Sequence, residues 1–189
     1  MKTIWQSIRM LAVLSVLTGL VYPLVMTGLA QKLFPGKANG SIIRQNNVPV
    51  GSELVGQPFS SDKYFWPRPS AVSYNPLPSA GTNLGPTSSV LRDSILARAE
   101  RFGAPVEVVP SDLLQASGSG LDPHISTEAA RFQVERIVQA RNLDQSSRTA
   151  LLSLIEERIE NPTLGIFGMP RVNVLRLNLA LDSLAGVQE

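Results

Sequence analysis

The stretch ASGSGLDPHIS, residues 116–126, holds the densest group of side chains in this sequence that could do chemistry. Glycines let backbone N–H groups converge on an anion, and a helix that begins behind such a loop adds a partial positive charge, so a phosphate cradle is possible. In the structural alternative, Gly118 and Gly120 are turn residues. Asp122 then caps backbone amides, and His124 is a hydrogen-bonded structural residue. The full Walker pattern G-x-x-x-x-G-K-[ST] is missing, which favours the structural interpretation over nucleotide binding.

The same residues make a poor catalytic or metal site. His124 is the only histidine and the chain has no cysteine, so carboxylates would have to supply every other metal ligand, and none stands at ligand spacing with it. A Ser–His–Asp triad would draw on residues 117–124 alone, whereas folds assemble triads from distant positions. We therefore expect no catalytic residue and no metal site in this chain.

Residues 64–70, YFWPRPS, form a second unusual passage. Its two prolines restrict the backbone. An exposed tryptophan beside an arginine would be a good contact for a partner protein. A tryptophan buried under the loop would instead belong to the core. The sequence leaves both interpretations open.

An apolar segment near the N-terminus indicates how the rest of the chain is held. Residues 10–30 carry no charge, and at 1.5 Å per residue they would form a helix about 31 Å long, which matches the hydrocarbon thickness of a bilayer. We predict one transmembrane helix at 10–30 behind a cytoplasmic tail, residues 1–9. A cleaved signal peptide is the alternative, because Lys2 and Arg9 precede the apolar run, but this run is longer than a usual signal core.

The domain that follows, residues 31–189, is expected in the periplasm. A short N-terminal tail ahead of the only span usually stays inside, and a long following domain translocates regardless of its charge. Two of the 17 basic residues precede the span, so the other 15 balance the 15 acidic residues of the domain. A neutral domain offers no basic field for nucleic acid, and we expect none as a partner. Ser15, Thr18 and Thr27 in the span favour packing on other helices.

The pattern of this domain predicts an α+β fold, one mixed domain without internal repeats. Residues 31–87 favour short strands and ordered loops, including a hairpin of 41–44 and 48–50 around an Asn-based turn. Residues 106–109 indicate another strand. Apolar stripes at helical spacing predict three helices, at 88–102, 127–142 and 147–160.

Serine residues mark two of these helix starts, Ser126 and Ser146, as N-caps. The last segment, 171–184, is ambiguous because its apolar residues partly alternate as in a strand. They also stand at helical spacing behind Pro170, a favoured first-turn residue. We therefore predict a helix there.

Five longer motifs occur in order: GSELVGQPF (51–59), YFWPRPSA (64–71), GTNLGPTSSVL (81–91), SDLLQASGSGLDPHIS (111–126) and GMPRVNVLRLNLALD (168–182). Together they resemble the C subunits of the bacterial Kdp potassium-transporting ATPase. The resemblance covers roughly residues 1–184, with the N-terminal anchor in the matching place. Five long motifs in sequence are far more specific than any single one.

This resemblance implies a subunit of a high-affinity, ATP-driven potassium uptake pump of the cell inner membrane. The implied partners are a channel-like A subunit, a P-type ATPase B subunit and a small F subunit. The resemblance also implies a catalytic chaperone that raises the ATP affinity of the B subunit. The chain has no D-K-T-G phosphorylation site, since Asp62-Lys63 continues into Tyr64. We expect a non-catalytic subunit.

Two mechanisms stay open. In the first, the anchor packs on the channel-like subunit and the outer domain covers or steadies the potassium entrance, which suits a neutral domain. In the second, the domain handles ATP, which the resemblance implies but a periplasmic location opposes, because ATP is cytoplasmic. A membrane-anchored enzyme or binding protein acting outside any pump is the alternative from a different class. The residues suspected of ATP binding are Gln115, Ser117, Gly118, Ser119 and Gly120.

Overall fold

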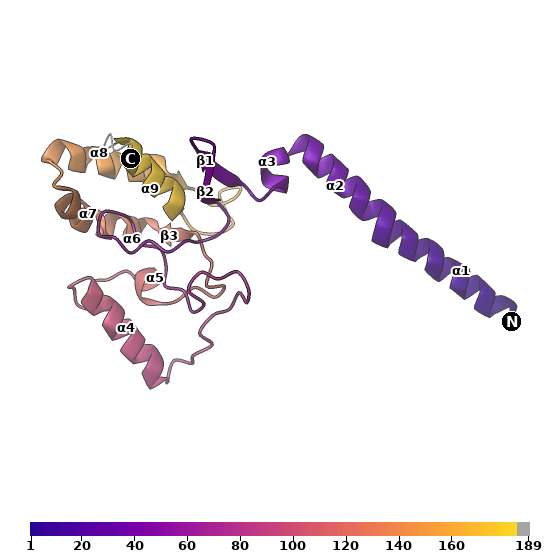
Figure 1. Cartoon of the computed structure of the whole chain (residues 1–189). Helices are drawn as coiled ribbons and strands as arrows, with labels where there is room; N and C mark the ends of the chain where they lie inside the picture. The colour runs from indigo at the N-terminus through magenta and orange to yellow at the C-terminus, as the bar shows by residue number, and fades with distance from the viewer. Residues whose placement is uncertain (185–189) are drawn as a thin grey trace. The chain divides into compact units, whose positions relative to one another are not determined.

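The computed structural model describes residues 1–184, which divide into two compact units (Figure 1). The N-terminal unit ends at Val50, and the C-terminal unit begins at Gly51. The first contains a long apolar helix and most of a hairpin, and the second contains a three-stranded sheet with several helices. The mixture of helix and sheet behind one apolar N-terminal helix confirms the predicted fold class.

One apolar helix occupies the start of the chain, as α1 (Lys2–Val16), a π-helical turn (Leu17–Val21) and α2 (Tyr22–Leu33). The π turn precedes Pro23, whose ring would meet the carbonyl of Gly19 in a regular α-helix, so the wider turn accommodates it. By length and composition the helix can cross a membrane, and its apolar window has no buried side chain. The predicted span, 10–30, lies within it, and residues 2–9 are helical as well.

A short helix and a hairpin follow, α3 (Pro35–Ala38), β1 (Ile42–Gln45) and β2 (Val48–Ser52). Asn46 and Asn47 join the two strands with φ values of 49° and 67°. A two-residue turn with positive φ at both positions matches the twist of an antiparallel hairpin, and asparagine tolerates that conformation. The predicted hairpin with an Asn-based turn is confirmed.

The sheet of the C-terminal unit has the order β3–β5–β4 and is antiparallel. Val172 in the central strand pairs with Ile125 on one side and with Ile159 on the other. Val172 and Ile125 are buried, which places an apolar row across the sheet against the helices. Each strand has only two or three residues: β3 (His124–Ser126), β4 (Ile159–Glu160) and β5 (Arg171–Asn173).

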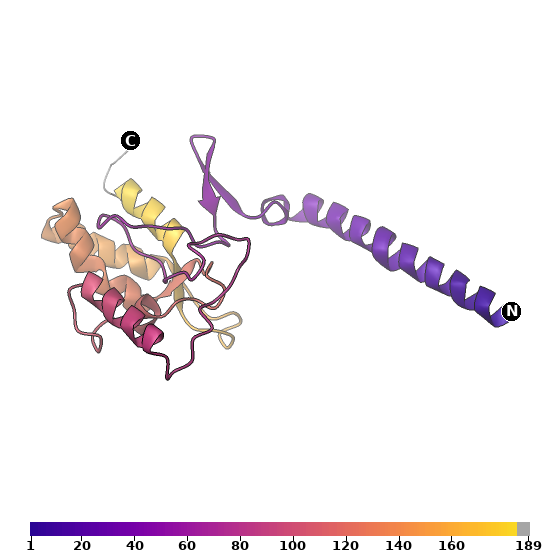
Figure 2. The ribbon, with the colours of Figure 1, turned by 60° about the horizontal axis from the view of Figure 1, so that its bottom comes forward.

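Helices pack against this sheet and against one another (Figure 2). α6 contacts β3, β5 and α8, while α9 contacts β5 and α8. The helices are α4 (Ser89–Arg101), α5 (Ser111–Leu114), α6 (Thr127–Phe132), α7 (Val134–Arg141), α8 (Gln145–Glu157) and α9 (Val174–Leu184). Their apolar faces and Phe65 form one core, which includes Val134, Ile137, Leu151, Ile155, Leu177 and Leu181.

Local capping explains where several helices begin and end. The Ser88 side chain accepts a hydrogen bond from the backbone N–H of Leu91 at the start of α4, and Gly103, with φ +63°, follows its end. The Ser126 side chain accepts from the N–H of Ala129 at the start of α6, as predicted.

Five sequence predictions were wrong in detail. Residues 106–109 form a turn rather than a strand, because the carbonyl of Pro105 accepts hydrogen bonds from the N–H groups of Val108 and Val109. The predicted helix 127–142 is interrupted at Gln133. Asp144, not Ser146, caps α8. Strand β4 replaces the last turn of the helix predicted at 147–160, and β5 the first turn of that predicted at 171–184.

Candidate functional site

The predicted phosphate loop connects α5 to β3 and is packed between two other loops. Ser117 is buried, with 3% of its surface exposed, and Gly120 is buried as well, whereas Gln115, Gly118 and Ser119 are exposed. Gly120 has φ +69°, and a Cβ there would lie 2.6 Å from Val72 Cγ2. The structure thus brings the five suspected residues together, with only three of them at the surface.

Several backbone groups of this loop bind neighbouring segments. The N–H of Ser117 donates to the carbonyl of Pro69 at 3.0 Å, and the N–H of Gly120 donates to the carbonyl of Ser117 at 3.3 Å. The carbonyl of Gly120 accepts from the Ser70 hydroxyl at 2.7 Å. The carbonyl of Ser119 accepts from the Ser79 hydroxyl at 2.8 Å. Two of the amides that could hold a phosphate are therefore bonded to protein carbonyls.

The glycines also do not lead directly into a helix. Strand β3 lies between the loop and α6, and the Ser126 side chain caps the first turn of that helix. The positive end of α6 is therefore separated from the glycines, which weakens the phosphate-cradle interpretation. Nucleotide binding at Gln115 and residues 117–120 stays a prediction.

A charged cluster follows the loop, centred on Asp122. The Asp122 carboxylate accepts hydrogen bonds from the Arg68 guanidinium at 3.0 Å and from the backbone N–H of His124 at 3.0 Å. The imidazole of His124 lies between two carboxylates, 3.6 Å from Asp122 and 3.4 Å from Glu160. Burial acts to raise the pKa of Asp122, but the hydrogen bonds from His124 and Arg68 outweigh it and hold that pKa below its ordinary value.

Acid should remove the stabilising contribution of the Asp122 carboxylate. Its pKa is depressed in the folded chain, so the contribution is fully present above the ordinary value, 3.8, and is lost as the pH falls through the folded pKa. We expect the difference in urea midpoint between the wild-type chain and Asp122→Asn to be at its full size by about pH 5 and to shrink below about pH 4. A difference that is unchanged at about pH 3 would contradict a role for the charge.

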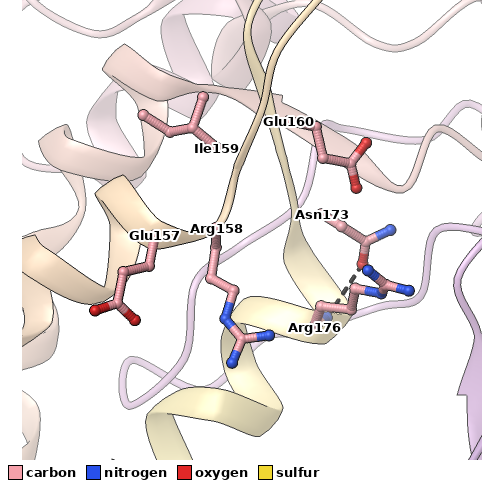
Figure 3. A pocket seen from close by; sticks show the side chains of 6 residues that line it. All are labelled: Glu157, Arg158, Ile159, Glu160, Asn173 and Arg176. Atoms are coloured by element: carbon pink, nitrogen blue, oxygen red, sulfur yellow. Dashed lines mark hydrogen bonds between the residues drawn. The ribbon is translucent and has the colours of Figure 1, made fainter.

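A polar pocket of about 290 Å³ lies beside this cluster and was missed by sequence reasoning (Figure 3). Its lining alternates in charge, so it favours no ligand of one sign. The Asn173 side-chain oxygen accepts from the backbone N–H of Arg176 at 3.1 Å, the dashed line in Figure 3. The lining comes from the end of α8, from β4 and β5, and from α9: Glu157, Arg158, Ile159, Glu160, Asn173 and Arg176.

The aromatic segment is buried, which decides between its two interpretations in favour of the core. Trp66 is 5% exposed, and the Cζ atoms of Arg101 and Arg136 lie 3.7 Å and 3.9 Å from its ring centroid. Burial lowers the pKa of Arg136 to about 10; the charge of Asp62 opposes this shift, and that of Arg101 adds to it. Tryptophan and arginines here form an internal contact.

Two buried side-chain amides hold the backbone of this segment. Asn178 accepts from the N–H of Phe65 at 2.8 Å and donates to its carbonyl at 3.0 Å. Gln133 does the same for Trp66, at 2.8 Å and 3.1 Å. We call Asn178 and Gln133 the amide clamp, because together they replace the strand partner that residues 65 and 66 would need in a buried environment.

Within residues 1–184, the structure contains no group of three or more His, Cys, Asp or Glu side chains placed to hold a metal ion. The family model of the K⁺-transporting ATPase c chain, KdpC, matches residues 4–183.

Individual relatives agree over nearly the whole chain. The potassium-transporting ATPase KdpC subunit of Methylobacterium nodulans is 50% identical and covers 92% of each chain. That of Geobacter sulfurreducens is 48% identical over 97% of this chain and 99% of the relative. That of Bradyrhizobium diazoefficiens is 45% identical over 98% of each. By this match the chain belongs to the KdpC family and is an accessory subunit of a K⁺-transporting ATPase.

Proposed function

We propose that this chain is a non-catalytic subunit that anchors itself in the cell inner membrane and steadies the assembled pump. Its tail of residues 1–9 lies in the cytoplasm, residues 10–30 of the helix Lys2–Leu33 span the bilayer, and the domain from residue 31 onward lies in the periplasm. The observation that carries the proposal is the apolar helix, which has no buried side chain in its apolar window. A span that no other residue among 1–184 covers is available to pack on other membrane helices.

The proposed partners are the channel-like A subunit, the P-type ATPase B subunit and the small F subunit, together with membrane lipid. The hydroxyl of Thr18 donates to the carbonyl of Leu14 one turn earlier, so this polar group is satisfied inside the helix and does not oppose insertion. In the periplasm, the neutral domain would cover or steady the potassium entrance. The names of the relatives favour this role over an envelope enzyme acting outside any pump.

The second candidate is the chaperone role, in which the chain raises the ATP affinity of the B subunit. Exposed Gln115, Gly118 and Ser119 support it, since a Cβ at Gly118 would meet no atom within 4 Å and a ligand can approach the backbone there. Ser117 and Gly120 would then hold the shape of this nucleotide loop. The candidate requires access to cytoplasmic ATP, so the orientation of the chain decides between the two.

Cysteine labelling in cells tests the orientation. Thr3→Cys and Val108→Cys place single thiols in a chain that has no cysteine, at an exposed position of the N-terminal helix and at a domain residue that is 60% exposed. We expect a membrane-impermeant thiol reagent to label Val108→Cys in intact cells and Thr3→Cys only after permeabilisation. The reverse pattern would overturn the proposed function and make the chaperone role the leading one. A mature protein that lacks residue 3 by mass spectrometry would show a cleaved signal and also contradict the proposal.

A further inference from the structure

The loop between β4 and β5, residues 162–170, exposes an unusual set of apolar side chains. It leaves the body of the C-terminal unit as an irregular tan segment (Figure 2). Its sequence, PTLGIFGMP, contains no charged residue. Leu164, Ile166, Phe167 and Met169 are between 66% and 83% exposed. Scattered apolar residues are normal on a surface, but four within six positions form an apolar patch, which is typical of a surface that contacts a protein or a membrane.

Four backbone N–H groups of this loop are bonded within the loop. Thr163 and Phe167 exchange both hydrogen bonds, N–H to carbonyl, at 2.9 Å and 3.0 Å. The N–H of Gly165 donates to the carbonyl of Pro162, and that of Ile166 to the carbonyl of Thr163. These amide groups do not need water, so moving the tip of the loop into an apolar medium leaves them satisfied.

The chemistry of the tip favours lipid over a protein groove. Protein–protein interfaces carry about one hydrogen bond per 100–200 Å². Thr163 is the only residue of the loop with a polar side chain, and the backbone amides named above are used internally. At the base of the loop, the exposed side chains of Arg158 and Arg171 can contact lipid phosphates, although Arg171 also pairs with Glu160 at 3.3 Å.

Residues 34–52 tether the C-terminal unit to the anchor, and Glu53, which follows this tether, lies beside strand β5. The carbonyl of Glu53 accepts from the Asn173 side chain at 2.8 Å, and its carboxylate pairs with Arg176 at 2.6 Å. Asn173 ends β5, the strand that leads out of the loop. Asn173 lies four positions after Met169, a span of at most about 14 Å. The apolar tip is therefore close to the entry point of a tether that leads to the membrane anchor.

We propose that the 162–170 loop inserts its apolar tip into the surface of the bilayer that the anchor spans, with Arg158 and Arg171 at the level of the lipid phosphates. The loop is then a second contact with the membrane, which limits the rotation of the domain about its tether. This inference rests on the membrane anchor of the proposed function. It does not depend on which side of the membrane the domain occupies.

Depth-dependent fluorescence quenching tests the insertion. The full chain with Met169→Cys carries an environment-sensitive NBD label and is reconstituted in nanodiscs of phosphatidylethanolamine and phosphatidylglycerol. We expect a blue-shifted emission, strong quenching by lipids with a nitroxide near the headgroup, and weak quenching by aqueous iodide. Adding Ile166→Asp and Phe167→Asp should shift the emission back to the red, weaken the quenching by lipid and strengthen the quenching by iodide. These exposed side chains drive the insertion without supporting the core. Val108→Cys, labelled in the same way, is the exposed control and should respond to iodide.

Two results would overturn the inference. One is a label at position 169 that behaves like the one at position 108. The other is a label that becomes shielded from both quenchers only when the partner subunits are present, since a protein would then cover the loop. A further label at Leu17→Cys separates these failures from that of the proposed function: if it is unquenched by lipids with a nitroxide on the acyl chain, the anchor itself is not in the membrane.

Discussion

Replacing Asn178 with leucine should lower the free energy of unfolding of the C-terminal unit by roughly 2–6 kcal/mol, since it leaves one buried N–H and one buried carbonyl without partners, each at about 1–3 kcal/mol. Both groups belong to Phe65, which is fully buried in the core. Leucine has the same branched shape as asparagine and a larger volume, so it leaves no cavity, and the loss combines the missing hydrogen bonds with some overpacking of the core. The measurement is urea unfolding of the full chain in detergent, followed by the fluorescence of Trp66 in a Trp5→Phe background.

Gln133 provides the matched test of the amide clamp. Gln133→Leu removes the two bonds to Trp66 and also the acceptor of a 2.7 Å hydrogen bond from Arg136, so a loss of similar size is expected. Gln139→Leu, at an exposed position of α7, is the control and should change stability by less than about 0.5 kcal/mol. Equal effects of the buried and exposed glutamines would contradict the clamp.

The double variant adds a test of cooperation. Asn178 and Gln133 bind adjacent residues of one segment, so once either is lost the segment moves and the other has less to hold. We therefore expect the double variant to lose less stability than the two single losses combined. Full additivity would mean that the two amides act on separate parts of the structure.

Long or strongly marked elements were predictable from the sequence. The apolar N-terminal helix follows from 21 mostly apolar residues without a charge, and the hairpin from two asparagines between short apolar runs. α4 follows from an apolar stripe bounded by polar residues before it and Gly103 after it. These signals are local, so no knowledge of distant contacts was needed.

The rest depends on contacts between distant residues. β3, β4 and β5 have two or three residues each, too few for alternation to be visible, and they exist because Val172 pairs with Ile125 and Ile159. Gln133 and Asn178 look like polar interruptions of helical patterns, and only the position of residues 65 and 66 explains them. The segment at Pro105 alternates like a strand but has turn hydrogen bonds.

The candidate site, too, was only partly predictable from the sequence. The composition of residues 115–120 singled out the loop, since glycine and serine there are dense. It did not indicate that Ser117 would be buried, because the carbonyl that accepts its N–H comes from Pro69, far away in the sequence. The pocket beside Asn173 takes its lining from four elements, and no spacing rule relates their residues.

Gly120→Ala should lower the free energy of unfolding by roughly 2–5 kcal/mol: about 1–2 kcal/mol for a side chain in the left-handed region, and about 1–3 kcal/mol for the crowding of the new Cβ. That Cβ would lie 2.6 Å from Val72 Cγ2 and 2.8 Å from the carbonyl oxygen of Ala80. Gly118→Ala is the matched control two residues away, because a Cβ there meets nothing within 4 Å. The urea midpoint should therefore fall for Gly120→Ala and hardly change for Gly118→Ala.

The Gly118→Ala variant also distinguishes a structural loop from a nucleotide site. A phosphate that approaches the exposed backbone at Gly118 would be obstructed by a methyl group, whereas a loop that only holds neighbouring segments together would not change. In the assembled pump, the proposed function predicts that Gly118→Ala leaves the ATP concentration for half-maximal K⁺-stimulated hydrolysis as in the wild type. A clear rise in that concentration, with normal stability and normal assembly, would favour the chaperone role and would contradict a purely structural loop at residues 115–120.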